Sequence, residues 1–190
     1  MYALVESGNI TKIFHNPQGF KLGDNQYSAD VFTKWSNSER EAIGIYAVTI
    51  DNTNKKNEKW YTNTNQTFTY DASAKTVTAT YGTATAKAHA DVTTDGVVTP
   101  GLKTELIRDL KKDVSRILSE TDWYITRNSE KSTAIPSNIT THRDAVRTKQ
   151  AEMETAITNA ADTAALETLY TYTEQEDGTA TRPLGELPEL

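Results

Sequence analysis

The spacing of apolar residues changes near Pro100, and this change constrains the fold more than any other feature. Before it, short runs alternate with a period of two, as where Phe68 and Tyr70 alternate with Thr67 and Thr69. After it, apolar residues recur every three or four positions. A period of two indicates strands and the longer period indicates amphipathic helices. We therefore expect an α+β chain with a small N-terminal antiparallel β domain, a C-terminal helical hairpin module and an extended tail.

The expected boundary lies in a segment with two chain-reversal signals, Asp95-Gly96 and Pro100-Gly101. The chain has 190 residues, which suits one ordinary domain or two small ones. Charge changes at the same place, because residues 1–99 carry a net charge of −1 and residues 100–190 one of −5. The expected parts are a Thr/Asn-rich β domain over 1–98, a helical module over 99–170 and an acidic extended tail over 171–190.

The β half contains several local signals for particular elements. Residues 2–6 and 10–14 flank a short Gly-containing connection, which predicts a β-hairpin. Residues 36–44 have a Ser or Asn cap, early acidic residues and a terminal Gly, the pattern of a short helix. The β-branched run 45–50 predicts a buried strand, and the loop 71–75 predicts a hairpin between two strands that are covered on one side only.

The helical half predicts three helices, over residues 101–119, 137–159 and 163–170. The first has a continuous apolar stripe, formed by Leu102, Leu106, Leu110, Val114 and Ile117. The second has a narrower strip, formed by Ile139, Val146, Met153 and Ile157. A narrow strip suits either an antiparallel partner helix or another chain.

Composition excludes several classes of protein. The chain has no cysteine, which removes disulfide frameworks, Cys-ligated zinc and Cys nucleophiles. No window approaches the roughly 20 apolar residues of a membrane helix, and we expect no export signal and no membrane insertion. The excess of 26 acidic over 20 basic side chains, without a basic cluster, speaks against nucleic-acid binding.

No catalytic, cofactor-binding or metal site is expected. The three histidines, His15, His89 and His142, are far apart and form no metal-ligand spacing. Phosphate-binding glycine loops, the serine elbow and the calcium loop are missing from the sequence. The neighbouring carboxylates lie among residues typical of solvated helix faces. The sequence therefore predicts a protein that is not an enzyme and needs no cofactor.

Four aromatic residues of the first half raise an alternative, a carbohydrate-binding module for a host-surface glycan. Trp35, Trp60, Tyr61 and Tyr81 would form a platform on which sugar rings stack. Packing in the core or at a sheet edge explains the same residues.

The most specific stretch of the chain runs from Leu118 to Arg127, with the sequence LSETDWYITR. It is followed by Glu130, by the Ile135-Pro136 break and by a helix containing Arg143 and Arg147. This pattern resembles the C-terminal helical segment of bacteriophage tail proteins, especially the tail-fibre assembly chaperone group, over about residues 102–157. The β domain and the long acidic tail depart from the shorter chaperones and favour a protein that stays in the particle.

The resemblance implies a non-enzymatic structural protein of the phage tail, associated with the tail fibre or the distal tail. Its partners would be other tail or tail-fibre proteins and further copies of the chain, in the virion and, during assembly, in the host cytoplasm. The alternative within the same group is a tail-fibre assembly chaperone that leaves after fibre maturation. Trp123 and Tyr124, at a helix end, are expected to lock two helices together or to meet a partner. The expected interface residues are Trp123, Tyr124, Arg143, Val146, Arg147, Met153 and Ile157.

Overall fold

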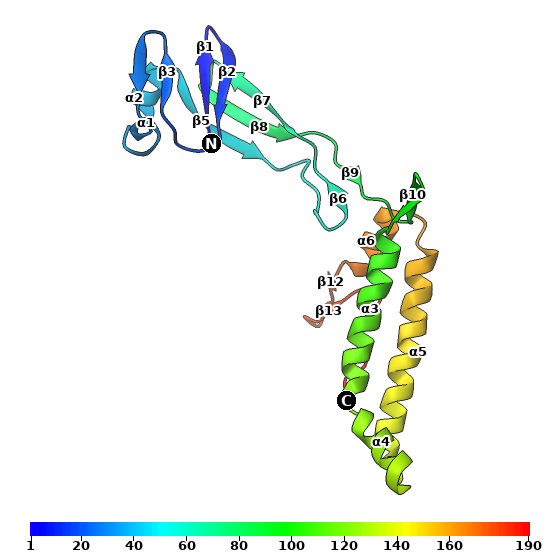
Figure 1. Ribbon diagram of the computed structural model, residues 1–190. Coiled ribbons are helices and arrows are strands. Elements are labelled where there is room, and N and C mark those ends of the chain that lie inside the picture. Colours follow the sequence, from blue (N-terminus) through cyan, green and yellow to red (C-terminus); the bar gives the residue numbers. More distant parts are fainter. The chain divides into compact units, whose positions relative to one another are not determined.

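The computed structural model describes residues 1–190, and the chain forms two compact units, Met1–Thr85 and Ala86–Leu190 (Figure 1). Both helices and strands are present, so the chain is α+β. Most of the strands belong to the first unit, and the four long or medium helices belong to the second.

The first unit is built on a five-stranded sheet with the strand order β2-β1-β5-β8-β7. Its strands are β1 (Tyr2–Glu6), β2 (Asn9–Phe14), β5 (Ile45–Asp51), β7 (Gln66–Asp71) and β8 (Thr76–Tyr81). The expected hairpins β1–β2 and β7–β8 are confirmed as antiparallel pairs. The expectation of a wholly antiparallel sheet is wrong, because β5 and β8 pair in parallel. β7 lies at the edge of the sheet. The strand that follows it, β8, pairs with β7 on one side and with β5 on the other, and runs parallel to β5.

One face of this sheet carries an aromatic core. Leu4 and Ile45 are opposite each other in the ladder and point to the same side. They pack there with Phe14, Phe20, Val31 and Phe32, and with the partly buried Tyr2, Leu22, Tyr27, Trp35 and Ile43. The additional residues come from β3 (Phe20–Leu22), β4 (Asn25–Tyr27), α1 (Asp30–Thr33) and the region of α2 (Asn37–Ala42). The predicted cap of α2 is present, since Ser36 and Glu39 form a reciprocal capping box.

The opposite face is closed by the curl of the sheet, since the edge strands β2 and β7 contact each other. Ala3, Val77 and Ala79 are fully buried there. On β7, the alternate residues Thr67 and Thr69 are exposed, as expected for strands covered on one side. The predicted burial of the strand 45–50 is wrong for most of its length, because Ile45 is its only buried residue.

The second unit contains two long helices, α3 (Leu102–Ser119) and α5 (Ser137–Asn159), which lie side by side and antiparallel (Figure 1). Both were expected from the apolar spacing, as was α6 (Thr163–Tyr170). The segment between the first two expected helices also contains a helix, the ten-residue α4 (Asp122–Lys131), which was not predicted. The remaining elements of the chain are the short strand pairs β6 (Tyr61–Thr62) with β9 (Thr85–Ala86), β10 (Val92–Thr94) with β11 (Val97–Thr99) and β12 (Thr173–Glu174) with β13 (Ala180–Thr181).

The segment before α3 packs with the helical unit. The N–H groups of Leu102 and Lys103 donate to carbonyls of residues 88 and 89, each at 3.0 Å. Asp91 accepts from the Gly101 N–H at 2.8 Å and from the Thr104 hydroxyl at 2.6 Å. These bonds satisfy the free N–H groups at the start of α3 and hold the pKa of the Asp91 carboxyl below its ordinary value. The second unit therefore begins at Ala86, before the expected start at residue 99.

The expected extended tail, residues 171–190, forms the β12–β13 hairpin and then packs on its own helical unit. Leu184 is 3% exposed, and its N–H donates to the Leu169 carbonyl at 3.1 Å. The Arg182 guanidinium pairs with Glu186 at 2.7 Å and lies over the ring of Tyr170. The tail is thus ordered by contacts within the chain, although its composition is that of a disordered segment.

Candidate protein-interaction site

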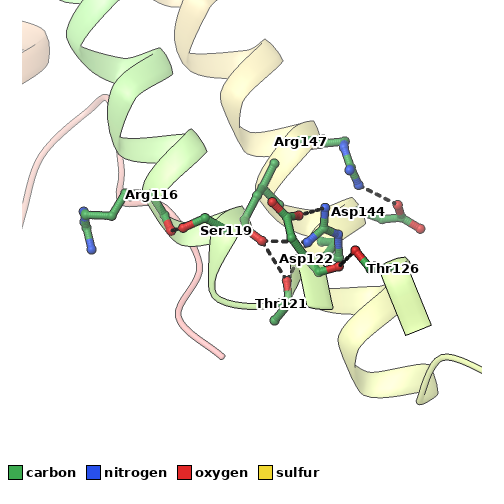
Figure 2. A network of polar contacts seen from close by, with 9 residues as sticks. Arg116, Ser119, Thr121, Asp122, Thr126, Asp144 and Arg147 are labelled. Atoms are coloured by element: carbon green, nitrogen blue, oxygen red, sulfur yellow. Dashed lines mark hydrogen bonds and ion pairs between the residues drawn. The ribbon is translucent and has the colours of Figure 1, made fainter. Parts of the chain in front are cut away.

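The corner between α3 and α4 is a tight turn made by the sequence Ser-Glu-Thr-Asp. The Thr121 N–H and hydroxyl both donate to the Leu118 carbonyl, each at 3.1 Å. The Ser119 hydroxyl donates to the Arg116 carbonyl at 2.7 Å, and the Thr126 hydroxyl donates to the Asp122 carbonyl at 3.3 Å (Figure 2). Short polar side chains of this kind satisfy helix-end carbonyls that would otherwise lack partners.

A buried guanidinium from α5 closes this corner. Arg143 Nη1 donates to the Leu118 carbonyl at 2.7 Å and to Thr121 Oγ1 at 2.6 Å. Its Nη2 pairs with Asp122 Oδ1 at 2.9 Å (Figure 2). The Arg143 side chain is only 8% exposed, whereas Asp122 is 60% exposed. Charge-assisted bonds from a planar guanidinium to three fixed oxygens hold the start of α4 in one position relative to α5.

The helix that this corner positions contributes no buried residue to the core. Trp123 is 52% exposed and Ile125 is 42% exposed. The Trp123 and Tyr124 rings lie 3.8 Å apart between centroids, and the Arg127 guanidinium lies 4.8 Å and 5.3 Å from their respective centroids. We call the three residues of this stack, Trp123, Tyr124 and Arg127, the α4 cluster; Ile125 lies two positions from both Trp123 and Arg127 and faces another side of the helix.

The α4 cluster has the composition of a binding hot spot. Trp, Tyr and Arg are the residue types most enriched among interface residues whose truncation costs the most binding energy. A surface of this kind on a helix without core residues is more informative than scattered exposed apolar side chains, which are normal on any protein. The arrangement suits the binding of another macromolecule.

The expected interface residues separate into two groups in the structure. Trp123, Tyr124 and Arg147 are exposed or half-buried, and Arg147 lies 3.7 Å from Asp144. Trp123 and Tyr124 were expected to lock two helices together, but α4 has no buried residue, and Arg143 joins the helices from the interior. The expected place of Arg143 in an interface with a partner is therefore wrong.

Three further expected interface residues, Val146, Met153 and Ile157, are 0%, 4% and 0% exposed. They are not available to a partner, because α5 packs against α3 and α6 within the unit. The narrow strip of α5 thus meets the antiparallel helix, one of the two partners that its width allowed.

The expected glycan platform is not assembled as an exposed surface. Trp60 and Tyr61 are 3% and 6% exposed. Trp35 packs edge-on to Tyr27 at 6.0 Å beside the aromatic core, and Tyr81 is half-buried with Lys55 over its ring at 5.8 Å. Packing, the other explanation of these residues, agrees with the structure.

One member of the α4 cluster, Arg127, was not expected as a site residue. Arg127 follows Trp123 by four positions, the spacing that brings side chains together on a helix surface. The sequence predicted no helix between residues 119 and 137, so this relation was not apparent.

The structure presents no group of three or more His, Asp or Glu side chains placed to hold a metal ion. None of the helices is both long and apolar enough to cross a membrane. Comparisons with protein-family models, with curated proteins and with solved structures each returned no match.

Proposed function

We propose that this chain is a non-enzymatic structural protein of a bacteriophage tail, associated with the tail fibre or the distal tail, which acts through protein–protein interfaces. The observation that carries the proposal is the α4 cluster, in which the exposed Trp123 lies beside the half-buried Tyr124 and Arg127, on a helix held in place by the buried Arg143. It lies in the stretch whose sequence resembles the tail-fibre assembly chaperone group. The proposed location is the virion tail, reached by assembly in the host cytoplasm.

The proposed organisation assigns different roles to the parts of the chain. The N-terminal β domain would be an accessory domain that remains in the particle, the helical hairpin module would carry the interface, and the C-terminal tail would stabilise the module. The exposed α4, at the end where α3 and α5 are joined, supports this division, because a partner would reach it without displacing core residues.

The first experiment is quantitative mass spectrometry of purified virions, combined with size-exclusion chromatography of the chain mixed with the tail-fibre protein. Peptides in a fixed ratio to other tail proteins are expected. Absence from the virion, together with a complex with fibre protein in solution, would identify a departing chaperone instead. Absence from both would refute the proposal.

A matched pair of variants locates the interface. Trp123→Ala removes an exposed side chain from the α4 cluster, and Ile50→Ala removes one of similar exposure, 52% against 46%, from the β unit. Trp123→Ala, alone or with Arg127→Ala, is expected to reduce incorporation into virions, and Ile50→Ala is not. Equal incorporation of all variants would place the interface elsewhere on the chain.

A further inference from the structure

Arg127 is a cation without an acidic partner within the chain. Five of the seven arginines pair with a carboxylate or donate to amide and carbonyl oxygens: Arg40, Arg108, Arg143, Arg147 and Arg182. Arg127 makes neither kind of contact, and only the rings of Trp123 and Tyr124 hold its guanidinium. Its Nε is buried and has no hydrogen-bond partner.

The chemistry of this guanidinium indicates what would bind it. Stacking on aromatic rings removes water from the face of the group and leaves the N–H donors in its plane. A carboxylate accepts two of these donors in parallel, and such charge-assisted pairs are about twice as strong as neutral hydrogen bonds. The missing partner is therefore a carboxylate that approaches the edge of the stack.

The acidic residues of α4 do not supply this carboxylate. Asp122 is taken by Arg143 at 2.9 Å. Glu130 is exposed one turn after Arg127 but does not pair with it. Beside the unpaired cation, Trp123 presents exposed apolar surface on the same face of α4. The surface thus combines one positive charge with apolar contacts on the same helix.

We propose that the α4 cluster binds an acidic segment of a partner protein. An Asp or Glu carboxylate of the partner accepts hydrogen bonds from Arg127, and a neighbouring apolar side chain of the same segment contacts Trp123. This inference rests on the proposed function for the existence of a protein partner and adds the chemistry of the segment that is recognised. Charge complementarity selects the segment, and the buried Arg143 holds the site ready for it.

The test is a selection of 12-residue peptides from a random display library on the immobilised full-length chain. The enriched peptides are expected to share an Asp or Glu next to Leu, Ile, Val or an aromatic residue. Arg127→Gln should weaken their binding about tenfold or more, since a charge-assisted bond is lost. Arg127→Lys should weaken peptide binding less than Arg127→Gln does, because the Lys ammonium keeps the positive charge but lacks the planar pair of N–H donors.

Arg116→Gln is the matched control. Arg116 is exposed in the last turn of α3 and, like Arg127, has no acidic partner, but no aromatic ring stacks on it. The control should bind the selected peptides as the wild type does, and circular dichroism should show equal helix content in all variants.

Three results would overturn the inference. The first is a selection that yields no binders or no acidic consensus, and the second is equal weakening by Arg116→Gln and Arg127→Gln. The third is a different occupant, shown by Arg127-dependent binding of polygalacturonate or Arg127-dependent dimerisation of the chain without peptide binding. Virion mass spectrometry is independent of these results, so the proposed function and this inference fail separately.

Discussion

At the residue scale, the interior of the α3–α4 corner depends on one basic side chain. Arg143 connects Leu118, Thr121 and Asp122, which lie more than twenty positions before it in the sequence. A buried charge is tolerated only when it is paired and hydrogen-bonded; here three oxygens accept from the two terminal nitrogens, while the buried Nε has no partner. The basic residue expected at an interface is thus a structural support of the site.

Arg143→Leu is expected to lower the free energy of unfolding of the helical unit by about 1 to 3 kcal/mol, because it removes the partner of Asp122 and the donor to the Thr121 hydroxyl oxygen, while the Leu118 carbonyl keeps its two Thr121 donors. Urea unfolding followed by far-ultraviolet circular dichroism measures this. Arg147→Leu is the control, since its exposed contact at 3.7 Å from Asp144 should contribute less than about 1 kcal/mol. Equal losses for the two variants would contradict the role given to Arg143.

A pH dependence follows from Asp91, whose pKa is lowered first by the Thr104 hydroxyl and then by the Gly101 N–H. Because the folded pKa lies below the unfolded one, the contribution of Asp91 is complete above the unfolded pKa, about 4. It is lost as the pH falls through the folded pKa. Asp91→Asn should therefore be less stable than the wild type at neutral pH, and the difference should narrow in acid.

Other carboxyl groups with lowered pKa values, those of Glu39, Asp51 and Asp177, titrate in the same range, so the informative quantity is the difference between wild type and variant. Asp95→Asn removes the same charge from the exposed turn of the neighbouring hairpin and should leave the wild-type dependence on pH unchanged. Parallel stability curves for Asp91→Asn and the wild type would show that the cap does not contribute.

At the scale of the element, α5 joins the interior of the helical unit to the corner that carries the α4 cluster. Its apolar strip is buried against neighbouring helices, and Arg143 lies on the same helix nearer its start. A change in the strip should therefore act on folding first and on assembly only through folding.

Met153→Asp should destabilise the helical unit by about 3 kcal/mol or more, because it places a carboxylate at a position that is 4% exposed. Ala151→Asp adds the same charge at an exposed position of the same helix and should change stability by about 0.5 kcal/mol or less. Chemical unfolding of both variants makes the comparison. A normally folded Met153→Asp chain that fails only in particle incorporation would restore Met153 as an interface residue.

At the scale of the whole molecule, the two units differ in charge as well as in secondary structure. Residues 1–85 contain 8 basic and 8 acidic side chains, whereas residues 86–190 contain 12 and 18, for a net charge of −6. The helical unit therefore carries the entire net charge of the chain. Arg127 is an unpaired cation within this acidic unit.

Separate expression of residues 1–85 and 86–190 should give two folded fragments, each with a cooperative thermal transition, because each unit has its own buried core. At neutral pH the second fragment should be retained on an anion exchanger and the first should pass through. A fragment without a cooperative transition would show that its unit depends on the other half of the chain.

Local patterns in the sequence determined much of the fold. The bounds of α3, α5 and α6 follow from apolar spacing, and the β7–β8 hairpin follows from alternation around residues 71–75, because these patterns involve residues close together in the chain. Trp123 and Tyr124 likewise stand out in the sequence as two adjacent large aromatic residues at a helix end.

The tertiary structure decided what depends on contacts between distant segments. The parallel pairing of β5 with β8, the burial of Val146, Met153 and Ile157, and the packing of Leu184 each require a neighbour that no local pattern identifies. The same holds for the site, because Arg143 acquires its role only when α5 returns beside α3, and Arg127 acquires its aromatic stack only when α4 is a helix. Local propensity fixes elements, whereas packing between elements fixes which side chains remain available for binding.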